Sequence, residues 1–313
     1  MSEAAGPDDL PTAPPPATRA GFVAILGAPN VGKSTLLNQL VGTKVSIVSP
    51  KVQTTRRRII GISMQGEAQV LFIDTPGIFA PKKRLERAMV LAAWAAASDA
   101  DLCLFLVDAK RGLDAAGRTV LAGLADLRSS PILVVNKIDL VPAARLLPLI
   151  KELNEAREFA ATFLVSAETG SGCAELLADV AARLPAGPWL FPEDQLSDLS
   201  NRAMAAEITR EKLFHQLHQE LPYSATVETE AWTESANGRE IRIDQVIYVQ
   251  RPSQKGIVLG KGGRQIKALG EAARLELEDI LEARVHLFLF VKVRERWQDD
   301  AERYGEMGLD FPR

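Results

Sequence analysis

Short apolar runs alternate with helix-like patterns through the first part of this 313-residue chain. Helical patterns begin at residue 33 and, in an alanine-rich segment, at residue 85. The runs typical of strands lie at residues 22–26, 58–63, 70–74, 101–108, 132–135 and 162–165. This alternation predicts a doubly wound α/β domain over residues 20–184, with helices on both faces of a largely parallel sheet.

The pattern changes after residue 184. Residues 185–192 contain three prolines, which cannot continue a helix, so a linker is expected at 185–197. Trp189 and Phe191 indicate that this linker packs against a domain rather than moving freely.

A second, α+β domain is expected over residues 198–296. Its patterns are a helix, two strands, a helical region and a last strand, at residues 198–220, 225–232, 240–250, up to 281, and 284–293. Asn237-Gly238 between the first two strands is a strong hairpin signal.

Composition is that of a globular protein, with 47% hydrophobic and 25% charged residues. The two cysteines suggest neither a disulfide framework nor a metal site, and no apolar run approaches the roughly 18 residues needed to span a bilayer. Residues 1–19, rich in proline, are expected as a disordered tail, and residues 297–313 as a C-terminal tail. A cytoplasmic monomer is the default expectation.

The strand at 22–26 runs into a complete G-x-x-x-x-G-K-[ST] loop followed by a helix. The loop's backbone N–H groups can wrap a β-phosphate, Lys33 can reach the β- and γ-oxygens, and Ser34 can bind a magnesium ion. A triphosphate site is therefore predicted. Its expected residues are Gly27, Ala28, Pro29, Asn30, Val31, Gly32, Lys33, Ser34 and Thr35.

The sequence Asn136-Lys137-Ile138-Asp139 follows the strand at 132–135, where a base would lie at the carboxyl end of a parallel sheet. The Asp139 carboxylate can accept hydrogen bonds from the N1–H and amino group of guanine, whereas adenine has no N1–H. Lys137 can pack its stem over the base. Ser166-Ala167-Glu168, after the strand at 162–165, is a second expected contact to the base.

Between these motifs lies Asp74-Thr75-Pro76-Gly77. Asp74 suits a carboxylate that holds magnesium through water, and Gly77 suits a loop that must approach a γ-phosphate. Upstream, a threonine of Gln53-Thr54-Thr55-Arg56 can complete the magnesium shell, with Thr55 favoured over Thr54. Two solvent-facing threonines are the alternative. The basic cluster at 56–58 is expected either to touch RNA or phosphate or to be solvated.

In the second domain, an apolar segment meets a Gly-x-x-Gly loop. Glycines let a loop approach a nucleic-acid backbone closely, and residues 251–296 contain ten Lys or Arg against six Asp or Glu. The flanking Ile257, Val258 and Ile266 can be core or groove residues. The expected RNA-binding residues are Gly260, Lys261, Gly262, Gly263, Arg264 and Lys267.

The order of the nucleotide motifs resembles the translation-factor class of GTPases, and Pro29-Asn30-Val31 narrows the resemblance to the Era-like branch. The second domain resembles a prokaryotic-type KH domain. Together these imply a GTPase that uses Mg²⁺, binds the 3′ end of small-subunit ribosomal RNA, assists 30S subunit maturation and associates peripherally with the inner membrane. The resemblance also makes Asn30 a candidate ligand for K⁺.

One departure from Ras-type GTPases concerns hydrolysis. The residue after Asp-Thr-Pro-Gly is Ile78, which cannot orient a water as glutamine does there, so slow intrinsic turnover is expected. Two alternatives to a GTP-driven switch stay open. One is an RNA-binding module in which nucleotide only stabilises the fold. The other is a tRNA-modification GTPase, which is disfavoured because it should carry a reactive cysteine and a further domain in place of the Gly-x-x-Gly loop.

Overall fold

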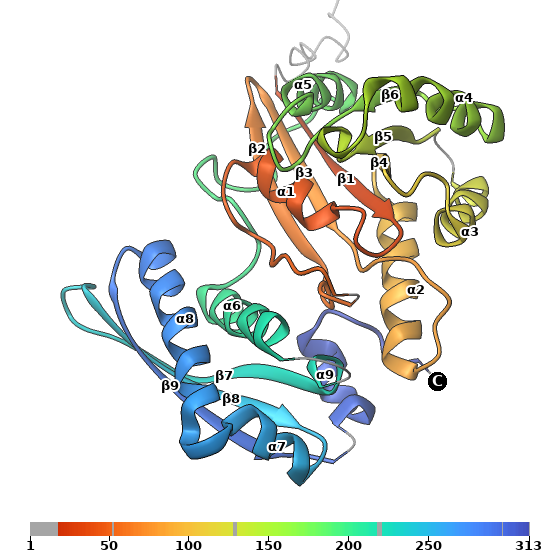
Figure 1. Cartoon of the computed structure of the whole chain (residues 1–313). Helices are drawn as coiled ribbons and strands as arrows, with labels where there is room; N and C mark the ends of the chain where they lie inside the picture. The colour runs from red at the N-terminus through yellow and green to blue at the C-terminus, as the bar shows by residue number, and fades with distance from the viewer. Residues whose placement is uncertain (1–17, 52, 128–129, 218–220, 296, 313) are drawn as a thin grey trace, which may run out of the picture.

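The computed structural model describes residues 18–51, 53–127, 130–217, 221–295 and 297–312. Two sheets, far apart in the sequence, form the centres of its two halves (Figure 1). Most of the tail expected at 1–19 lies outside the described residues, and Arg19 already begins the first strand.

The first sheet has the strand order β2-β3-β1-β4-β5-β6, with every neighbouring pair parallel except β2 and β3. Its strands are β1 (Arg19–Gly27), β2 (Ile59–Gln65), β3 (Ala68–Asp74), β4 (Leu102–Asp108), β5 (Ile132–Asn136) and β6 (Ala161–Leu164). The order reverses beside β1, which is where doubly wound sheets bind ligands at the carboxyl ends of their strands.

Helices cover both faces of this sheet, which confirms the doubly wound prediction. Leu36 of α1 and Leu176 of α5 lie in one core cluster, whereas Ala93 of α2, Val120 of α3 and Leu149 of α4 lie in the other. The α-helices are α1 (Lys33–Val41), α2 (Arg84–Asp99), α3 (Ala115–Gly123), α4 (Leu146–Ala156) and α5 (Cys173–Arg183). Short 3₁₀ turns are η1 (Leu124–Asp126), η2 (Ile138–Leu140) and η3 (Ala143–Arg145).

The linker after α5 lies along the edge of the first sheet, as its aromatic residues indicated. The buried Gln69 side chain donates from Nε2 to Phe191 O at 2.8 Å and accepts from Leu190 N at 2.8 Å. Trp189 Nε1 donates to Glu67 O at 3.1 Å. These contacts fix the path of the chain toward the second sheet.

The second sheet has the order β7-β8-β9, with β7 antiparallel and β9 parallel to β8. Gly238 has φ 67°, so it makes the expected hairpin turn. The elements are α6 (Asn201–Gln216), η4 (Pro222–Ser224), β7 (Ala225–Glu234), β8 (Glu240–Val249), α7 (Pro252–Leu259), η5 (Lys261–Gly263), α8 (Arg264–Leu281) and β9 (Arg284–Val293). Helix α6 begins three residues later than predicted because the Ser200 side chain caps it. Residues 218–220 of that predicted helix lie outside the described residues.

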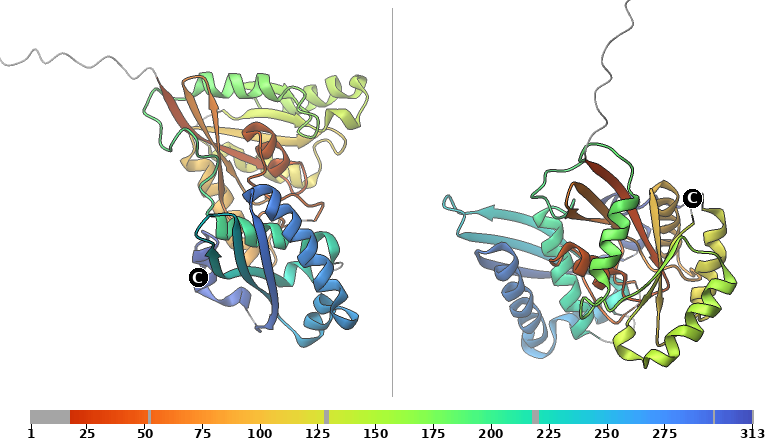
Figure 2. Two further views of the ribbon diagram at one scale, coloured as in Figure 1. Left: turned by 90° about the vertical axis from the view of Figure 1, so that its left-hand side faces the viewer. Right: turned by 90° about the horizontal axis from the view of Figure 1, so that it is seen from above.

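Helices α6, α7 and α8 share a core with this sheet. Val258 is fully buried there and Ile266 packs against it, whereas Ile257 is 57% exposed. Val258 is therefore a core residue, Ile266 borders the core, and Ile257 is the exposed one of the three. In both Figure 1 and Figure 2, α6 lies between the two sheets, so it faces the first domain as well as its own.

The C-terminal segment differs from the tail expected at 297–313. It forms η6 (Trp297–Asp299) and α9 (Ala301–Glu306), and the Trp297 and Tyr304 side chains are each only 1% exposed. Both pack with Met89 of α2, and Trp297 Nε1 donates to Ser224 O at 2.9 Å. The segment folds because it has enough apolar surface to bury. None of the helices in the described ranges combines the length and the apolar character needed to span a bilayer.

Candidate nucleotide site and RNA interface

The phosphate loop joins the end of β1 to the start of α1. Gly32 has φ 99°, and a Cβ there would lie 2.4 Å from Asn136 Nδ2, so only glycine fits. Lys33 Nζ donates to Ala28 O at 3.1 Å and to Gly27 O at 3.3 Å, which turns its charge back over the loop. The loop and the N-terminus of α1 therefore offer backbone N–H groups and a cation to an anion.

Lys33 is almost completely buried. This burial lowers the pKa of its ammonium group to about 8, although the nearby Asp74 carboxylate acts in the opposite direction. A phosphate bound beside Lys33 would favour the charged form. A bound nucleotide would therefore raise the pKa of Lys33.

Hydroxyl groups from three segments converge on the Asp74 carboxylate at the end of β3. Its Oδ2 accepts hydrogen bonds from Ser34 Oγ at 2.6 Å, Ser46 Oγ at 2.7 Å and Thr55 Oγ1 at 3.2 Å. Ser34 Oγ and Thr55 Oγ1 lie 3.0 Å apart. Thr54 is not part of this cluster, because its Oγ1 donates to Lys51 O at 2.6 Å.

The second carboxylate oxygen of Asp74, Oδ1, is buried and has no hydrogen-bond partner within the described part of the chain. Burial raises the pKa of this carboxyl, opposed by the hydroxyl hydrogen bonds and by Lys33. An unpartnered carboxylate oxygen beside two hydroxyl groups is a donor set of hard oxygens, which suits Mg²⁺. Ser46 was missed by sequence reasoning, because it belongs to no recognisable motif.

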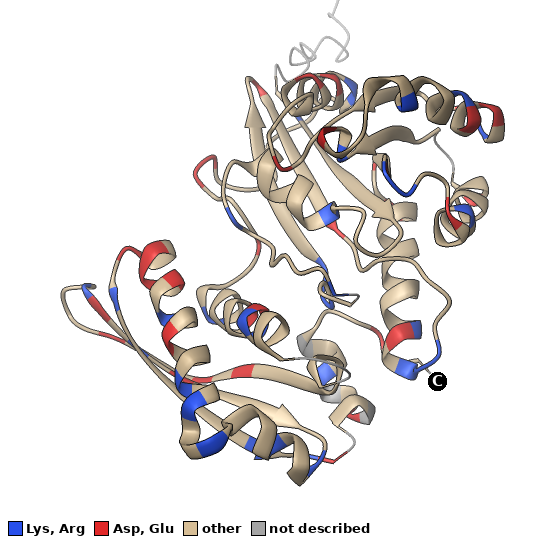
Figure 3. Cartoon of the chain, viewed as in Figure 1, with Lys and Arg blue, Asp and Glu red and all other residues tan. Residues whose placement is uncertain are grey.

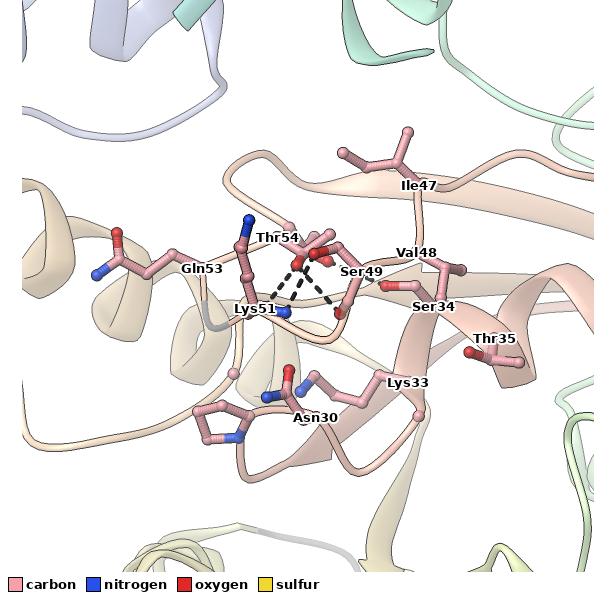
Figure 4. Close-up of a pocket in the computed structure, with 14 residues that line it drawn as sticks. Asn30, Lys33, Ser34, Thr35, Ile47, Val48, Ser49, Lys51, Gln53 and Thr54 are labelled. Carbon is pink, nitrogen blue, oxygen red and sulfur yellow. Dashed lines mark hydrogen bonds between the residues drawn. The ribbon is translucent and has the colours of Figure 1, made fainter. Parts of the chain in front are cut away.

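A pocket opens between the phosphate loop and the segment before β2 (Figure 4). Lys33 and Asn30 form one side of it, and Ser49 and Thr54 lie across from them, whereas Ile47 points away. The lining residues are Pro29, Asn30, Gly32, Lys33, Ser34, Thr35, Ile47, Val48, Ser49, Lys51, Gln53, Thr54, Thr55 and Gly77. Asn30 has φ 64°, and its Nδ2 donates to Pro50 O at 2.8 Å.

The Asp-Thr-Pro-Gly segment lies directly against the phosphate loop. Thr75 Oγ1 donates to Ile25 O at 2.6 Å, which ties the segment to β1, and Pro76 is buried. A Cβ on Gly77 would lie 2.9 Å from Pro29 Cα, so this close approach requires glycine. Ile78 packs into the core with 1% exposure, so it presents no polar group to a water.

Asn136 connects the segments that were expected to meet at the base. Its Nδ2 donates to Val31 O at 2.9 Å, while its Oδ1 accepts from Ala167 N at 3.0 Å. Lys137 Nζ donates to Asn30 O and to Asp108 Oδ2, each at 2.7 Å. These internal bonds hold the phosphate loop against the expected base site.

The remaining residues expected at the base differ in exposure. Asp139 and Glu168 are exposed, which leaves both carboxylates accessible. Ser166 is buried, and its Oγ accepts from Thr169 N at 3.2 Å, so it shapes the loop around Ala167. Asp108, which holds Lys137, carried no motif signal in the sequence.

The basic cluster at 56–58 requires a correction. Arg56 is 2% exposed, and it donates from Nη1 to Ala225 O at 2.7 Å and from Nη2 to Pro222 O at 3.0 Å. Neither solvation nor contact with RNA describes this side chain, because it is buried and both Nη atoms donate to backbone carbonyls of the second domain. Arg58, by contrast, is exposed.

The Gly-x-x-Gly loop lies where α7 meets α8. Gly260, Gly262 and Gly263 all have positive φ angles, of 70°, 62° and 75°. A Cβ on Gly260 would lie 2.6 Å from Gln265 Cβ, whereas open space surrounds Gly262 and Gly263. The nearby Lys261, Arg264 and Lys267 are exposed. Figure 3 shows that Lys and Arg residues gather at this end of α8 and acidic residues at the other end.

Comparison with known proteins supports both halves of this description. Residues 22–137 match the family model described as 50S ribosome-binding GTPase, and residues 220–298 match the KH domain model. Fold and site therefore define a class: a P-loop GTPase that carries a KH domain.

Relatives that span the chain narrow this class. The chain is 59% identical to GTPase Era of Mesorhizobium japonicum over 98% of its own length and 99% of that protein. It is 57% identical to GTPase Era of Brucella suis biovar 1, with 94% of both chains covered. This chain belongs to the Era family of GTPases, and it is a GTP-hydrolysing enzyme.

Solved structures agree with this assignment. A crystal structure of an Aquifex aeolicus Era variant bound to GDP and AlF₄⁻ is similar, with a TM-score of 0.88 and 41% identity. A second, of Era in complex with MgGDPNP and nucleotides 1506–1542 of 16S ribosomal RNA, has the same TM-score and identity. Each of these two matches covers 93% of this chain and 99% of the solved chain.

Proposed function

We propose that this GTPase is a switch that binds the 3′ end of 16S ribosomal RNA and assists maturation of the 30S subunit. In this proposal GTP orders the segments 53–56 and 74–78, and hydrolysis releases them. The observation that carries it is the convergence of Ser34 and Thr55 on Asp74, because this joins the phosphate loop to both segments. A relative solved with MgGDPNP and 16S ribosomal RNA supports it.

Magnesium is the cofactor that the Asp74 cluster fits. Ser34 and Thr55 would hold the ion through their hydroxyl groups, and Asp74 would hold it through water. The ion would supply positive charge to neutralise phosphate oxygens during transfer. The unpartnered, buried Oδ1 of Asp74 supports this assignment, since an isolated buried carboxylate oxygen is otherwise costly.

The remaining site residues have roles that follow from their positions. Backbone N–H groups of residues 27–35 would bind the phosphates, and Thr75, Pro76 and Gly77 would bring the chain to the γ-phosphate. Asn136 would fix the geometry of the base site, Lys137 would cover the base, and Asp139 would accept from guanine. Ser166, Ala167 and Glu168 would close the other side of the base.

Hydrolysis in this proposal depends on a group other than residue 78. Ile78 is buried and apolar, so it cannot orient a water, and the unassisted enzyme is expected to be slow. Asn30 is an exposed loop residue at the pocket and is our candidate ligand for K⁺. Equal GTPase rates in potassium and sodium buffers would remove Asn30 from this role.

RNA would bind at the loop that contains Gly260 to Gly263, with Lys261, Arg264 and Lys267 contacting phosphates. Gly262→Asp tests this site, because a side chain there meets no neighbouring atom and adds negative charge. We expect RNA affinity to fall at least about tenfold, while GTP hydrolysis without RNA is unchanged. Gly238→Asp is the matched control, since Gly238 has a similar φ of 67° and equally open surroundings in a distant hairpin.

The switch itself is tested by the affinity for a short single-stranded RNA of the 16S 3′ end, measured with GDP and with a non-hydrolysable GTP analogue. A difference between the two affinities supports the switch. Equal affinities would leave the passive RNA-binding module, in which nucleotide only stabilises the fold. We further propose that the protein acts as a cytoplasmic monomer, with peripheral association at the inner membrane as a separate property testable by vesicle sedimentation.

A further inference from the structure

The segment between α1 and β2 forms the outer wall of the nucleotide pocket and also contacts helix α6. Lys44 Nζ lies 2.6 Å from Glu211 Oε2, and Val48 N donates to Glu211 Oε1 at 2.7 Å. Ile47 is 1% exposed, and it packs in a cluster whose other buried residues come from α6, β8, α8 and β9 of the second domain. Ile47 and Val48 also line the nucleotide pocket, so these two residues join the pocket wall to α6, whereas Lys44 is not among the residues that line the pocket.

Two arginines form hydrogen bonds between the second domain and the residues on either side of Thr55. Arg210 of α6 donates from Nη2 to Thr54 O at 2.6 Å, so it holds the peptide unit that precedes Thr55. Arg56, the residue after Thr55, donates to Ala225 O and Pro222 O of the KH domain. The second domain thus forms hydrogen bonds with the residues on both sides of Thr55, and Thr55 itself bonds to Asp74.

Both arginines are buried against one aromatic side chain. Each is 2% exposed, and both guanidinium groups lie over the ring of Phe214, at 5.3 Å for Arg210 and 5.5 Å for Arg56. Arg210 Nε also donates to Glu207 Oε1 at 3.1 Å. A guanidinium held by a carboxylate and an aromatic face loses little further freedom when it binds Thr54 O.

We propose that Arg210 and Arg56 are positioning residues for GTP hydrolysis, through which the docked KH domain holds Thr55 at the Asp74 cluster. This inference rests on the proposed role of Thr55 at the magnesium site. Because coupling between two sites is reciprocal, a KH domain displaced from this position weakens the preference for GTP over GDP. Conversely, GTP bound with Thr55 in place stabilises the docked KH domain.

The test uses the full-length protein with Arg210→Met and Arg210→Lys, and with Lys44→Met as the matched control. Lys44→Met removes ion pairs with Glu211 of α6 and Glu276 of α8, both of which keep Lys212 as a partner, and it touches neither peptide unit beside Thr55. We expect Arg210→Met to reduce kcat and the analogue-over-GDP affinity ratio about tenfold each, with GDP affinity unchanged. Lys44→Met should leave all three quantities within about twofold of wild type.

A double-mutant cycle separates positioning from simple destabilisation. If Arg210 acts through Thr55, adding Arg210→Met to Thr55→Ala changes the affinity ratio no further. Hydrogen exchange at residues 54–56 should accelerate in Arg210→Met and not in Lys44→Met. Thermal unfolding checks that each variant is folded. If Arg210→Met does not fold, Arg210→Lys takes its place in the cycle, because it keeps the positive charge beside Glu207.

Two results would overturn the inference: additive effects of Arg210→Met and Thr55→Ala, or Arg210 variants that behave like Lys44→Met. These failures differ from a failure of the proposed function. In that case the wild-type protein itself would show equal RNA affinity with GDP and with the GTP analogue, whatever the Arg210 variants do.

Discussion

Nucleotide binding should become weaker as the pH rises above the pKa of Lys33. That pKa is lowered to about 8 by burial in the free protein, and bound phosphates favour the charged lysine. Binding above pH 8 therefore requires uptake of a proton. A pH dependence of this sign would identify Lys33 as the group that meets the phosphates.

The magnitude follows from the protonated fraction of Lys33 in the free protein. With a pKa of about 8, this fraction falls from about 90% at pH 7 to about 25% at pH 8.5. If the lysine stays charged in the complex, GDP affinity falls about fourfold over this interval. The change has the opposite sign to any gain from ionisation of the raised-pKa carboxyl of Asp74, which would favour cation binding at higher pH.

The assay is isothermal titration of GDP in EDTA at pH 7 and pH 8.5, repeated in buffers of different ionisation enthalpy to count protons. EDTA removes the contribution of a cation bound near Asp74. Lys33→Met is the control, because the ratio of wild-type to variant affinity cancels any titration of GDP itself. A ratio that does not change with pH, or proton release in place of uptake, would refute the reasoning.

Three further predictions concern specificity and stability. Asp139→Asn should reduce the preference for GTP over ATP by about 1–3 kcal/mol, and competition binding that shows full guanine selectivity would remove Asp139 from its role. Gly32→Ala should lower both stability and GDP affinity, because its Cβ would meet Asn136 Nδ2 at 2.4 Å, whereas Gly42→Ala, at φ 83° in open space, should lower stability alone. Trp297→Ala should destabilise the protein by about 3–5 kcal/mol in urea unfolding, and a loss below about 1 kcal/mol would contradict its burial against α2.

Much of the fold could be predicted from the sequence, because short stretches of apolar and turn residues indicate most of its strands and helices. Every predicted strand of the first sheet is present, since each was an apolar run bounded by turn residues. The signals for the hairpin at Gly238 and for the helices around the Gly-x-x-Gly loop also came from short stretches of sequence. The preference for Thr55 over Thr54 as the magnesium ligand had little basis in the sequence and stays a prediction, but in the structure it is Thr55 that hydrogen-bonds to Ser34 and Asp74.

Contacts between distant parts of the chain could not be predicted in this way. Arg56 looks like any basic residue at a strand entrance, and only the tertiary structure places backbone carbonyls around it. Ser46 reaches Asp74 without belonging to a motif. The C-terminal segment did carry a signal, in the aromatic residues Trp297, Tyr304 and Phe311, but its acidic residues made a solvated tail the simpler expectation.

The C-terminal segment also affects the order in which the protein can assemble during synthesis. The first sheet and its helices are complete at Arg183, so this half of the molecule can fold while the rest is still being made. Leu85 and Met89 of α2, however, stay uncovered until Trp297 and Tyr304 have been added. A nascent chain therefore has a formed nucleotide fold in which one apolar face of α2 stays exposed until the segment that contains Trp297 and Tyr304 has been made.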